Sequence, residues 1–457
     1  MSRSGVTVNY KSSAIHNTLS NGSFTLKTAG KYMEDDIGVV VDLVPDLESR
    51  WFTNNGTYHA SNAGIDGFDV VTVSVTPPLA SKTITNNGTY TASLESLYGY
   101  DVVDVNVSNY DGVALGGDSG RYFDANLSAV RPYGFYSHSA LTEVEIPECT
   151  AIGASAFYGC SSLATISFPK CETIGVAAFS GCSLITEAVF PECLSIGQSA
   201  FIGCNSLSTL SFPKCETIGS SAFYSLSSNI TSAVFPACIS ISGTAFQNCR
   251  ELSAASFKEC TTIGIWAFQN CVILSQTYFP KVQKIDTGAF AGCVNLTSVA
   301  FNNCTSINNN AFSGCTQLSQ ISFPSCASIG GSVFLNCEKL TEAVFPLCRS
   351  VYGQAFQGCK ELTMASFGKL NNFSGSSIFS GCSKLESIYL LSTAGVPSLS
   401  NVNAFAGTPM SDSSYLGRWG SIFVPDTLYS SYITAQKWSQ YSARIVGLTS
   451  EQIAALG

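Results

Sequence analysis

Histidine and charged residues are scarce in this 457-residue sequence. The three histidines, His16, His59 and His138, fall in separate segments, and charged residues make up 12% of the chain. The net charge is −9, and the 22 lysines and arginines are scattered without a basic stretch. We therefore expect no nucleic-acid partner and no anionic membrane surface as partner. The sequence has no run of about 18 apolar residues, so we also expect no insertion into a membrane.

The sequence also lacks the motifs of common catalytic, cofactor and metal sites. It has no Walker loop, no Gly-x-Gly-x-x-Gly motif and no EF-hand loop. Residues 117–120 (Gly-Asp-Ser-Gly) resemble the nucleophile motif of trypsin-like proteases, but Arg121 stands where that family has glycine, so we interpret the segment as a linker. A glycosidase needs two carboxylates across a cleft, and outward strand positions offer such a pair only at Glu143 and Glu145. We predict that the protein is not an enzyme and has no catalytic residue, cofactor or metal.

Cysteine and phenylalanine, in contrast, recur at a fixed spacing. The sequence has 19 cysteines, all between Cys149 and Cys382, and almost every gap between them is 11 residues or a multiple of 11. An Ala-Phe pair or its variant recurs thirteen times between Phe135 and Phe405, at steps of 22 or 23 residues with a last step of 26. A fixed period of this length predicts a solenoid of stacked repeats.

One unit, residues 163–182, shows how each coil is expected to fold. Ile166 and Phe168 alternate with polar residues, which is typical of a half-buried strand. Pro169 ends the strand because it cannot donate a backbone hydrogen bond. A single coil cannot bury its apolar side, so neighbouring coils must stack. We predict a mainly β solenoid of about 12 coils, each of 22–23 residues.

The repeat resembles a known family. Residues 337–346 (Cys-Glu-Lys-Leu-Thr-Glu-Ala-Val-Phe-Pro) and 218–223 (Ile-Gly-Ser-Ser-Ala-Phe) are similar to the BspA-like, or Treponema-type, leucine-rich repeat, and the match recurs from about residue 130 to residue 405. The tail from Ser421 onward is similar to the closing segment common in such proteins. It predicts a last strand, a helix started by Asp426 and an aromatic cover over the end of the core. The resemblance implies a surface protein that binds proteins, host matrix or cells.

The cysteines have three interpretations: disulfides, metal ligands or small buried side chains. Units that lack one cysteine have Leu226, Val282 or Leu370 instead, and an apolar slot accepts all of these residue types. No two cysteines are closer than 11 residues, so no Cys-x-x-Cys motif indicates zinc. We favour buried thiols over disulfides, and disulfides over metal. The predicted structural thiols are Cys160, Cys171, Cys182, Cys193, Cys204, Cys249, Cys271, Cys293, Cys315, Cys337 and Cys359.

The first 110 residues contain a different repeat. Thr-Asn-Asn-Gly-Thr-Tyr at 53–58 returns at 85–90, and Gly-Phe-Asp-Val-Val at 67–71 returns as Gly-Tyr-Asp-Val-Val at 99–103, both at an offset of 32. Asn-Gly turns and Val-x-Val strands predict small β modules that cannot be stable alone. Residues 26–41 are a candidate third unit. The modules resemble those of tail- or appendage-associated proteins of phages from gut Firmicutes, and generic β linkers are the alternative.

These patterns predict the organisation of the whole chain. We expect an N-terminal segment 1–45, two β modules over 46–110, a linker and solenoid cap over 111–134, the solenoid over 135–405 and a C-terminal cap containing a helix over 406–457. The N-terminus lacks the apolar core of a signal peptide. Combined with adhesin-type repeats, this favours a phage virion appendage made in the host cytoplasm. The alternative is a bacterial cell-surface adhesin, and a repeat protein inside the cell is a third hypothesis.

Outward strand side chains form the predicted ligand-binding face, which is rich in hydroxyl groups. The expected partner is a protein or glycan receptor on a cell surface, and the N-terminal modules are expected to bind other virion proteins and to form a homo-oligomer. The alternative for each residue is a solvated surface that keeps the protein soluble. Anchors are expected among the variable aromatic residues, which are Tyr158, Tyr224, Trp266, Tyr278 and Tyr389. The predicted face comprises Thr165, Ser167, Glu187, Thr209, Ser211, Gln276, Tyr278, Gln320, Glu342 and Tyr389.

Overall fold

The protein divides into two compact units, residues 1–120 and 121–457. In the first unit, β1 (Val39–Asp42) and β2 (Val71–Ser74) pair in parallel, with Val39 opposite Val71. Their offset of 32 residues equals the spacing of the sequence repeat in this region. The rest of the predicted modules lies outside the described residues, so the predicted boundaries there stay predictions. The computed structural model describes residues 39–42, 71–74, 120–226, 230–411 and 419–456.

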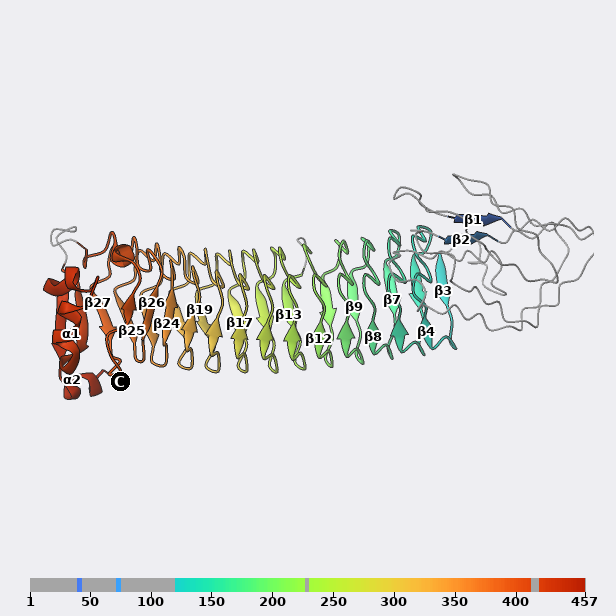
Figure 1. The fold of residues 1–457 in the computed structure, drawn as a ribbon. Coiled ribbons are helices and arrows are strands. Elements are labelled where there is room, and N and C mark those ends of the chain that lie inside the picture. The colour runs from blue at the N-terminus through green and yellow to red at the C-terminus, as the bar shows by residue number, and fades with distance from the viewer. Residues whose placement is uncertain (1–38, 43–70, 75–119, 227–229, 412–418, 457) are drawn as a thin grey trace, which may run out of the picture. The chain divides into compact units, whose positions relative to one another are not determined.

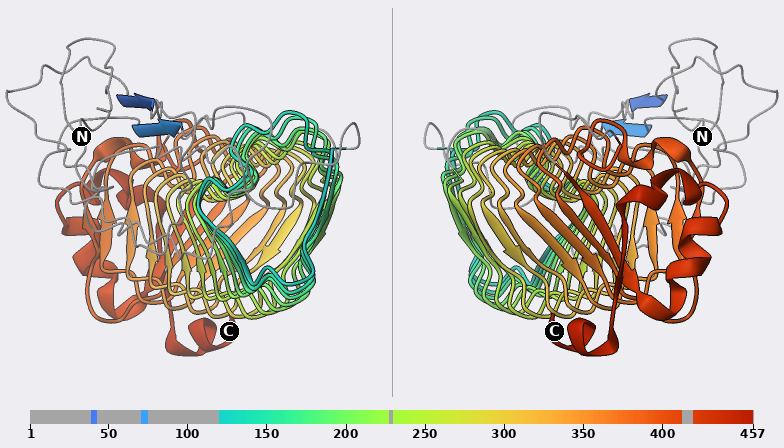
Figure 2. Two further views of the ribbon diagram at one scale, coloured as in Figure 1. Left: turned by 90° about the vertical axis from the view of Figure 1, so that its right-hand side faces the viewer. Right: turned by 90° about the vertical axis from the view of Figure 1, so that its left-hand side faces the viewer.

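The second unit is a parallel β solenoid, as the repeat spacing predicts (Figure 1). Each coil contributes one strand to each of two sides, which Figure 2 shows in views along the stack. On one side, each strand pairs in parallel with the equivalent strand of the next coil, and thirteen strands form one continuous sheet. The prediction of about 12 coils is thus confirmed, and the structure counts thirteen in this sheet.

The continuous sheet contains every strand with an even number from β4 to β28. Its order follows the chain, from β4 at one edge to β28 at the other. The strands are β4 (Ala129–Val130), β6 (Ala151–Ile152), β8 (Thr173–Ile174), β10 (Ser195–Ile196), β12 (Thr217–Ile218), β14 (Ser240–Ile241), β16 (Thr262–Ile263), β18 (Lys284–Ile285), β20 (Ser306–Ile307), β22 (Ser328–Ile329), β24 (Ser350–Tyr352), β26 (Asn372–Ser374) and β28 (Ser398–Leu399).

The other side of the coil has shorter sheets of two to five strands, which we call the segmented sheets. Their pairs are also parallel and in register, so equivalent residues of successive coils lie in rows. The strands are β3 (Arg121–Phe123), β5 (Glu143–Glu145), β7 (Thr165–Ser167), β9 (Glu187–Val189), β11 (Thr209–Ser211), β13 (Ser232–Val234), β15 (Ala254–Ser256), β17 (Gln276–Tyr278), β19 (Ser298–Ala300), β21 (Gln320–Ser322), β23 (Glu342–Phe345), β25 (Met364–Phe367), β27 (Ser387–Leu390), β29 (Ser421–Pro425) and β30 (Ile445–Leu448).

Two columns of phenylalanine fill the core between the two sides. The first column contains the Ala-Phe residues, and its rings stack: the centroids of Phe246 and Phe268 are 5.3 Å apart with an interplanar angle of 1°. The second column follows the segmented sheets, with Phe257 stacked on Phe279 at 5.3 Å. Rings of the two columns meet edge to face, as Phe246 and Phe257 do at 70°. Stacked and edge-to-face pairs are both favourable arrangements of the ring quadrupoles.

The 19 cysteines all lie among the described residues, where they are buried and form no disulfide. In the Gly-Cys column, each thiol donates to a phenylalanine carbonyl of the preceding coil, as Cys271 Sγ does to Phe246 O at 3.2 Å. In the Pro-x-Cys column, each thiol donates to the carbonyl two residues later, as Cys260 Sγ does to Thr262 O at 3.3 Å. Burial raises the pKa of Cys260 to about 12, so the unreactive thiol form persists at neutral pH.

An aromatic cap covers the C-terminal end of the core. The ring of Trp438 packs against Phe373 and Phe405, and its indole N–H donates to the carbonyl of Pro397 at 2.8 Å. Tyr432 meets Trp438 edge to face, with ring centroids 5.4 Å apart. Both rings are buried. The predicted aromatic cover is therefore confirmed.

The cap also contains the predicted strand and helix. Strands β29 and β30 extend the last segmented sheet beyond β27. Asp426 begins a 3₁₀ turn, and the α-helix itself begins one turn later, so the predicted helix start at Asp426 is corrected to Tyr429. The helical segments are η2 (Val402–Phe405), η4 (Asp426–Leu428), α1 (Tyr429–Thr434), η5 (Ser439–Arg444) and α2 (Ser450–Ala454).

A mutation in the phenylalanine columns tests their contribution to stability. Phe268 is fully buried and stacks between Phe246 and Phe290. We expect Phe268→Ala to lower the free energy of unfolding by about 3–5 kcal/mol, because it leaves a cavity that the stack cannot close. Urea denaturation followed by circular dichroism measures this change. Ser275→Ala, at an exposed position, is the control and should change it by less than about 0.5 kcal/mol. A loss no larger than the control's would contradict the prediction.

The buried thiols predict a loss of stability at alkaline pH. Burial raises the pKa of Cys260, Cys304 and Cys326 to about 12, whereas an exposed thiol has a pKa of about 8.5. The unfolded chain therefore releases protons that the folded chain retains. The stabilisation from these groups is complete below about pH 8.5 and is lost as the pH rises towards 12.

Urea denaturation in reducing buffer at a series of pH values measures this dependence. The matched control replaces all three cysteines with valine, the residue type that Val282 already places in the same column. Because tyrosine and lysine titrate in both proteins, the difference between the two profiles isolates the thiols. The control should lose less stability per pH unit above pH 8.5. Parallel profiles would refute the assignment.

Candidate binding surfaces

The outward side of the segmented sheets, which we call the strand face, has the geometry that strand alternation predicts. In β9, Glu187 and Val189 are exposed while Ala188 between them is buried. In β17, Gln276 and Tyr278 are exposed in the same way. Seven of the predicted residues are exposed, namely Thr165, Glu187, Thr209, Gln276, Tyr278, Gln320 and Glu342. The remaining three are half-buried, namely Ser167, Ser211 and Tyr389.

One row of the strand face alternates apolar side chains with serine. Val234 and Tyr278 lie on either side of Ser256, and further along Val344 lies beside Ser366. The exposed fractions are 52% for Val234, 55% for Tyr278 and 46% for Val344. Apolar residues two strands apart are separated by about 10 Å, twice the spacing of paired strands. The row therefore presents separate apolar contacts within a hydroxyl-rich surface.

The predicted aromatic anchors do not share one surface. Tyr278 lies on the strand face, whereas Tyr158, Tyr224 and Trp266 lie on the arms. We define an arm as the segment between the end of a strand of the continuous sheet and the next Gly-Cys or equivalent turn, such as residues 264–270. Each arm turns the chain back towards the segmented sheets. The sequence could not separate the two surfaces, because aromatic residues occur on both.

Two of these aromatic residues pack against neighbours within the protein. Tyr158 stacks on Tyr136 of the preceding coil with ring centroids 5.0 Å apart. Tyr389 stacks on Phe423 with centroids 4.7 Å apart, because β29 of the cap pairs directly with β27. This packing gives Tyr389 a structural role at the end of the stack and leaves Tyr278 as the more accessible aromatic residue of the strand face.

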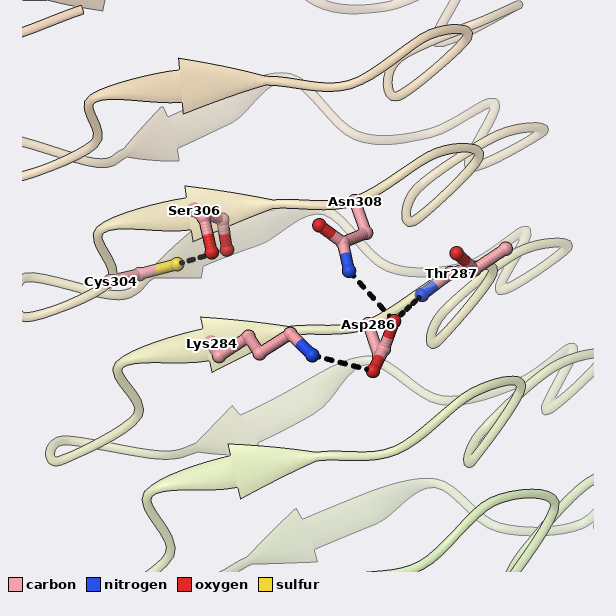
Figure 3. Close-up of polar contacts among 6 residues, drawn as sticks. All are labelled: Lys284, Asp286, Thr287, Cys304, Ser306 and Asn308. Atoms are coloured by element: carbon pink, nitrogen blue, oxygen red, sulfur yellow. Dashed lines mark hydrogen bonds and ion pairs between the residues drawn. The ribbon is translucent and has the colours of Figure 1, made fainter.

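A polar cluster interrupts the regular pattern at β18. Asp286 follows this strand, at a position where several coils have glycine; at Gly197, a Cβ would lie 2.5 Å from the backbone of the neighbouring coil. The Asp286 carboxylate accepts hydrogen bonds from Lys284 Nζ at 2.9 Å, from Asn308 Nδ2 at 2.7 Å and from the Thr287 amide at 2.9 Å (Figure 3). The sequence analysis missed this cluster, although a carboxylate in the glycine column was a visible signal.

The environment keeps Asp286 ionised. Partial burial raises the pKa of Asp286, but hydrogen bonds from Asn308, Lys284 and the Thr287 amide outweigh this effect and lower the pKa below its ordinary value. The Lys284 ammonium pairs with the carboxylate, so the cluster has little net charge. It is therefore suited to hydrogen bonding rather than to attracting an ion.

Ion pairs along the solenoid connect neighbouring coils without creating a charged patch. Lys170 pairs with Glu148, and Lys214 pairs with Glu192, each across 22 residues. These side chains are about half exposed, so solvent screens them. Among the described residues, no group of three His, Cys, Asp or Glu side chains is placed to bind a metal ion. In the same part of the chain, no helix has both the length and the apolar character that a membrane crossing requires.

The repeat identifies the family of the chain. The family described as "BspA type Leucine rich repeat region (6 copies)" matches residues 128–253, 239–363 and 325–414, which together are more than half of the sequence. This chain belongs to the BspA-type leucine-rich repeat family. Proteins of this family are non-catalytic binding proteins, so the chain is a binding protein and not an enzyme.

Solved structures similar to this BspA-type protein come from several bacteria. A leucine-rich repeat protein from Bacteroides ovatus is 22% identical, with 57% of this chain and 82% of that chain covered and a TM-score of 0.38. The Treponema pallidum protein TpLRR is 26% identical, with 34% of this chain and 78% of that chain covered and a TM-score of 0.32. A leucine rich cell surface protein from Faecalibacterium prausnitzii is 20% identical, with 82% of this chain and 95% of that chain covered and a TM-score of 0.38. No curated protein sequence matches the chain.

The family match does not test the predicted virion role. The family match covers the solenoid and does not extend into the N-terminal modules on which the phage resemblance rested. The virion appendage and its alternative, a bacterial cell-surface adhesin, therefore both stay predictions.

Proposed function

We propose that this BspA-type protein is an adhesin of a bacterial cell surface and that its strand face binds a protein. Family membership supports a binding role. The observation that supports this face is the row in which exposed Val234, Tyr278 and Val344 each lie beside a serine. The cores of protein interfaces are apolar, enriched in tyrosine and depleted of charge, with a polar rim. The strand face offers this combination.

The dimensions and rigidity of the strand face suit a protein partner. The apolar row begins at Val189 on β9 and continues to Val344 on β23, seven strand spacings later. At about 4.8 Å per spacing, the row is about 34 Å long, close to the diameter of about 32 Å of a circular interface of about 800 Å² per partner. Hydrogen bonds between coils hold the strands, so binding orders little backbone and costs little conformational entropy.

The side chains of the row favour a protein over a glycan at this face. Valine offers neither a flat ring for a sugar to stack on nor a hydrogen bond for a hydroxyl group. Its branched side chain fills small apolar depressions, as it does in protein cores. Tyr278 adds a large apolar ring with a hydroxyl group, the combination found at binding hot spots.

A double variant tests the strand face. Val234→Ser with Tyr278→Ser introduces the residue type already present at Ser211 and Ser256 in the same row, so the fold should tolerate it. Loss of two anchors should weaken binding to immobilised fibronectin, laminin or collagen, or to epithelial cells, by about tenfold or more. Biolayer interferometry measures the matrix proteins and flow cytometry measures the cells.

The matched control is Ile239→Ser, which removes an exposed apolar side chain beside the continuous sheet. Ile239 has an exposed fraction of 47%, close to that of Val234. Its loss should leave binding unchanged. Equal losses for the control and the double variant would refute the assignment of the strand face. Absence of binding to every matrix protein and to cells would refute the proposed adhesin function. Antibodies to residues 121–457 give a second test: labelling of purified virions but not of intact producing bacteria would also refute it.

We further propose that the first unit assembles copies of the chain. The support is the small size of each 32-residue module, which needs neighbours to be stable. Light scattering of the full chain and of a variant that starts at Tyr122 measures the absolute mass of each. We expect an oligomer for the full chain and a monomer for the shortened variant. Two monomers would contradict the proposal.

A further inference from the structure

Trp266 occupies a backbone position that does not suit a tryptophan. Its φ is 55°, and its exposed fraction is 44%. This left-handed conformation costs a residue other than glycine about 1–3 kcal/mol. The first coil has Tyr133 at the equivalent position, and the later coils have small or polar residues with the same positive φ, namely Ser155, Ala177, Ser199, Ser221, Thr244, Gly288, Asn310, Ser332, Gln354 and Ser377. The fold thus accepts a serine where Trp266 stands, so the backbone conformation does not require the indole.

The indole of Trp266 is held against the backbone of the next coil. A Cβ built on Gly288 would lie 2.2 Å from Cδ1 and 2.6 Å from Nε1 of the indole, so the ring uses space that only glycine leaves free. Trp266 N donates to Thr287 O at 2.9 Å, and Gly288 N donates to Asn309 O at 2.9 Å. The ring is therefore fixed from one side and still accessible to solvent, which is the arrangement of a preorganised binding platform.

The two coils that follow Trp266 carry polar side chains on the same arms as Gly288 and its equivalent Asn310. The Asp286 carboxylate is two residues before Gly288, and Asn308 donates to it from the next coil (Figure 3). Asn309 and Asn310 are exposed on the same arm as Asn308, and Asn309 Oδ1 accepts a hydrogen bond from Gly331 N at 2.8 Å, which fixes its side chain. Carboxylates and carboxamides together both accept and donate hydrogen bonds.

We propose that Trp266, Asp286, Asn309 and Asn310 form a binding site for a neutral carbohydrate. The C–H groups on one side of a sugar ring carry slight positive charge and pack on the negative face of an indole. The hydroxyl groups at the edge of the sugar donate to the carboxylate and exchange hydrogen bonds with the carboxamides. The site follows β16, β18 and β20 of the continuous sheet, so it is separate from the strand face and goes beyond the proposed protein binding.

The charges of the site argue against a cation or a phosphate as ligand. A cation would be attracted by an unpaired carboxylate, but Lys284 Nζ lies 2.9 Å from Asp286 Oδ2. Aromatic cages for quaternary ammonium groups use several rings around the cation, whereas Trp266 is a single platform. A phosphate would meet the Asp286 carboxylate, and the one lysine of the cluster is already paired with it. A neutral ligand with many hydroxyl groups matches these features.

The test uses the full chain and an array of immobilised neutral oligosaccharides built from glucose, mannose, galactose and N-acetylglucosamine. Calorimetry and tryptophan fluorescence then measure the affinity for the best of them in solution. We expect binding that Trp266→Ser weakens by at least about tenfold. Serine at Ser221 and Ser332 shows that the backbone accepts this change. Asp286→Asn, which removes the charge and keeps the shape, should weaken binding to a smaller extent.

Gly288→Ala distinguishes the platform from a general effect of mutation. Alanine is tolerated at the equivalent Ala177, with a φ of 52°, but its methyl group at position 288 would displace the indole of Trp266. We expect a loss of affinity comparable to that of Trp266→Ser, although the tryptophan is still present. Ser332→Ala, at the equivalent position two coils later, is the matched control and should bind like the unmodified protein.

Three results would overturn the proposal. The first is that no saccharide binds at concentrations up to about 10 mM. The second is equal saccharide affinity of Trp266→Ser and the unmodified protein, and the third is tighter binding of tetramethylammonium than of any saccharide. The strand-face variant Val234→Ser with Tyr278→Ser should keep its saccharide affinity. Failure of the carbohydrate site and failure of the protein-binding face are therefore measured separately.

Discussion

Stacking of phenylalanine on phenylalanine at the repeat spacing is the constraint on which the solenoid depends. Each ring must meet the equivalent ring of the next coil, and the coil length adapts to this requirement. The 23-residue step from Phe223 to Phe246 gives a centroid distance of 5.1 Å, and the 22-residue step from Phe246 to Phe268 gives 5.3 Å. The extra residue is thus absorbed outside the core. The strands on both sides of the coil and the two thiol columns keep their register because the rings keep theirs.

The same constraint leaves the surface free to vary, which is how a repetitive fold acquires specific sites. A core position such as Phe268 is repeated in every coil, so it carries no information about a ligand. A surface position that differs from its equivalents in the other coils does carry such information. Trp266 and Gly288 depart together from the residues above and below them, and the indole of one occupies the space left by the other. Comparing a surface residue with the equivalent residues of the neighbouring coils therefore shows whether it departs from the repeat.

The sequence predicted those features that depend on the repeat alone. The period of 22 predicted the coils, the alternation around Phe168 predicted which strand residues point outward, and Val282 and Leu370 in place of cysteine indicated an apolar slot. The side-chain contacts that irregular segments make with the coils were not predictable. Tyr389 resembled a free anchor because nothing in the aperiodic segment after Phe405 shows that β29 would place Phe423 beside it. Asp286 in the glycine column was a visible signal, but its hydrogen bond with Asn308 depends on the stacking of one coil on the next.

In-register stacking also has a consequence for the gene that encodes this chain. Unequal recombination between similar repeats removes or duplicates DNA in whole units. A change of one 22-residue unit would rejoin the rows of Phe246 and Phe268 without a mismatch, whereas a change of any other length would place polar residues opposite the ring columns. The length of the stack can therefore evolve in steps of about 4.8 Å, the spacing of paired strands. Such steps would alter the distance of the Trp266 surface from the two ends of the solenoid while every contact within each coil is preserved.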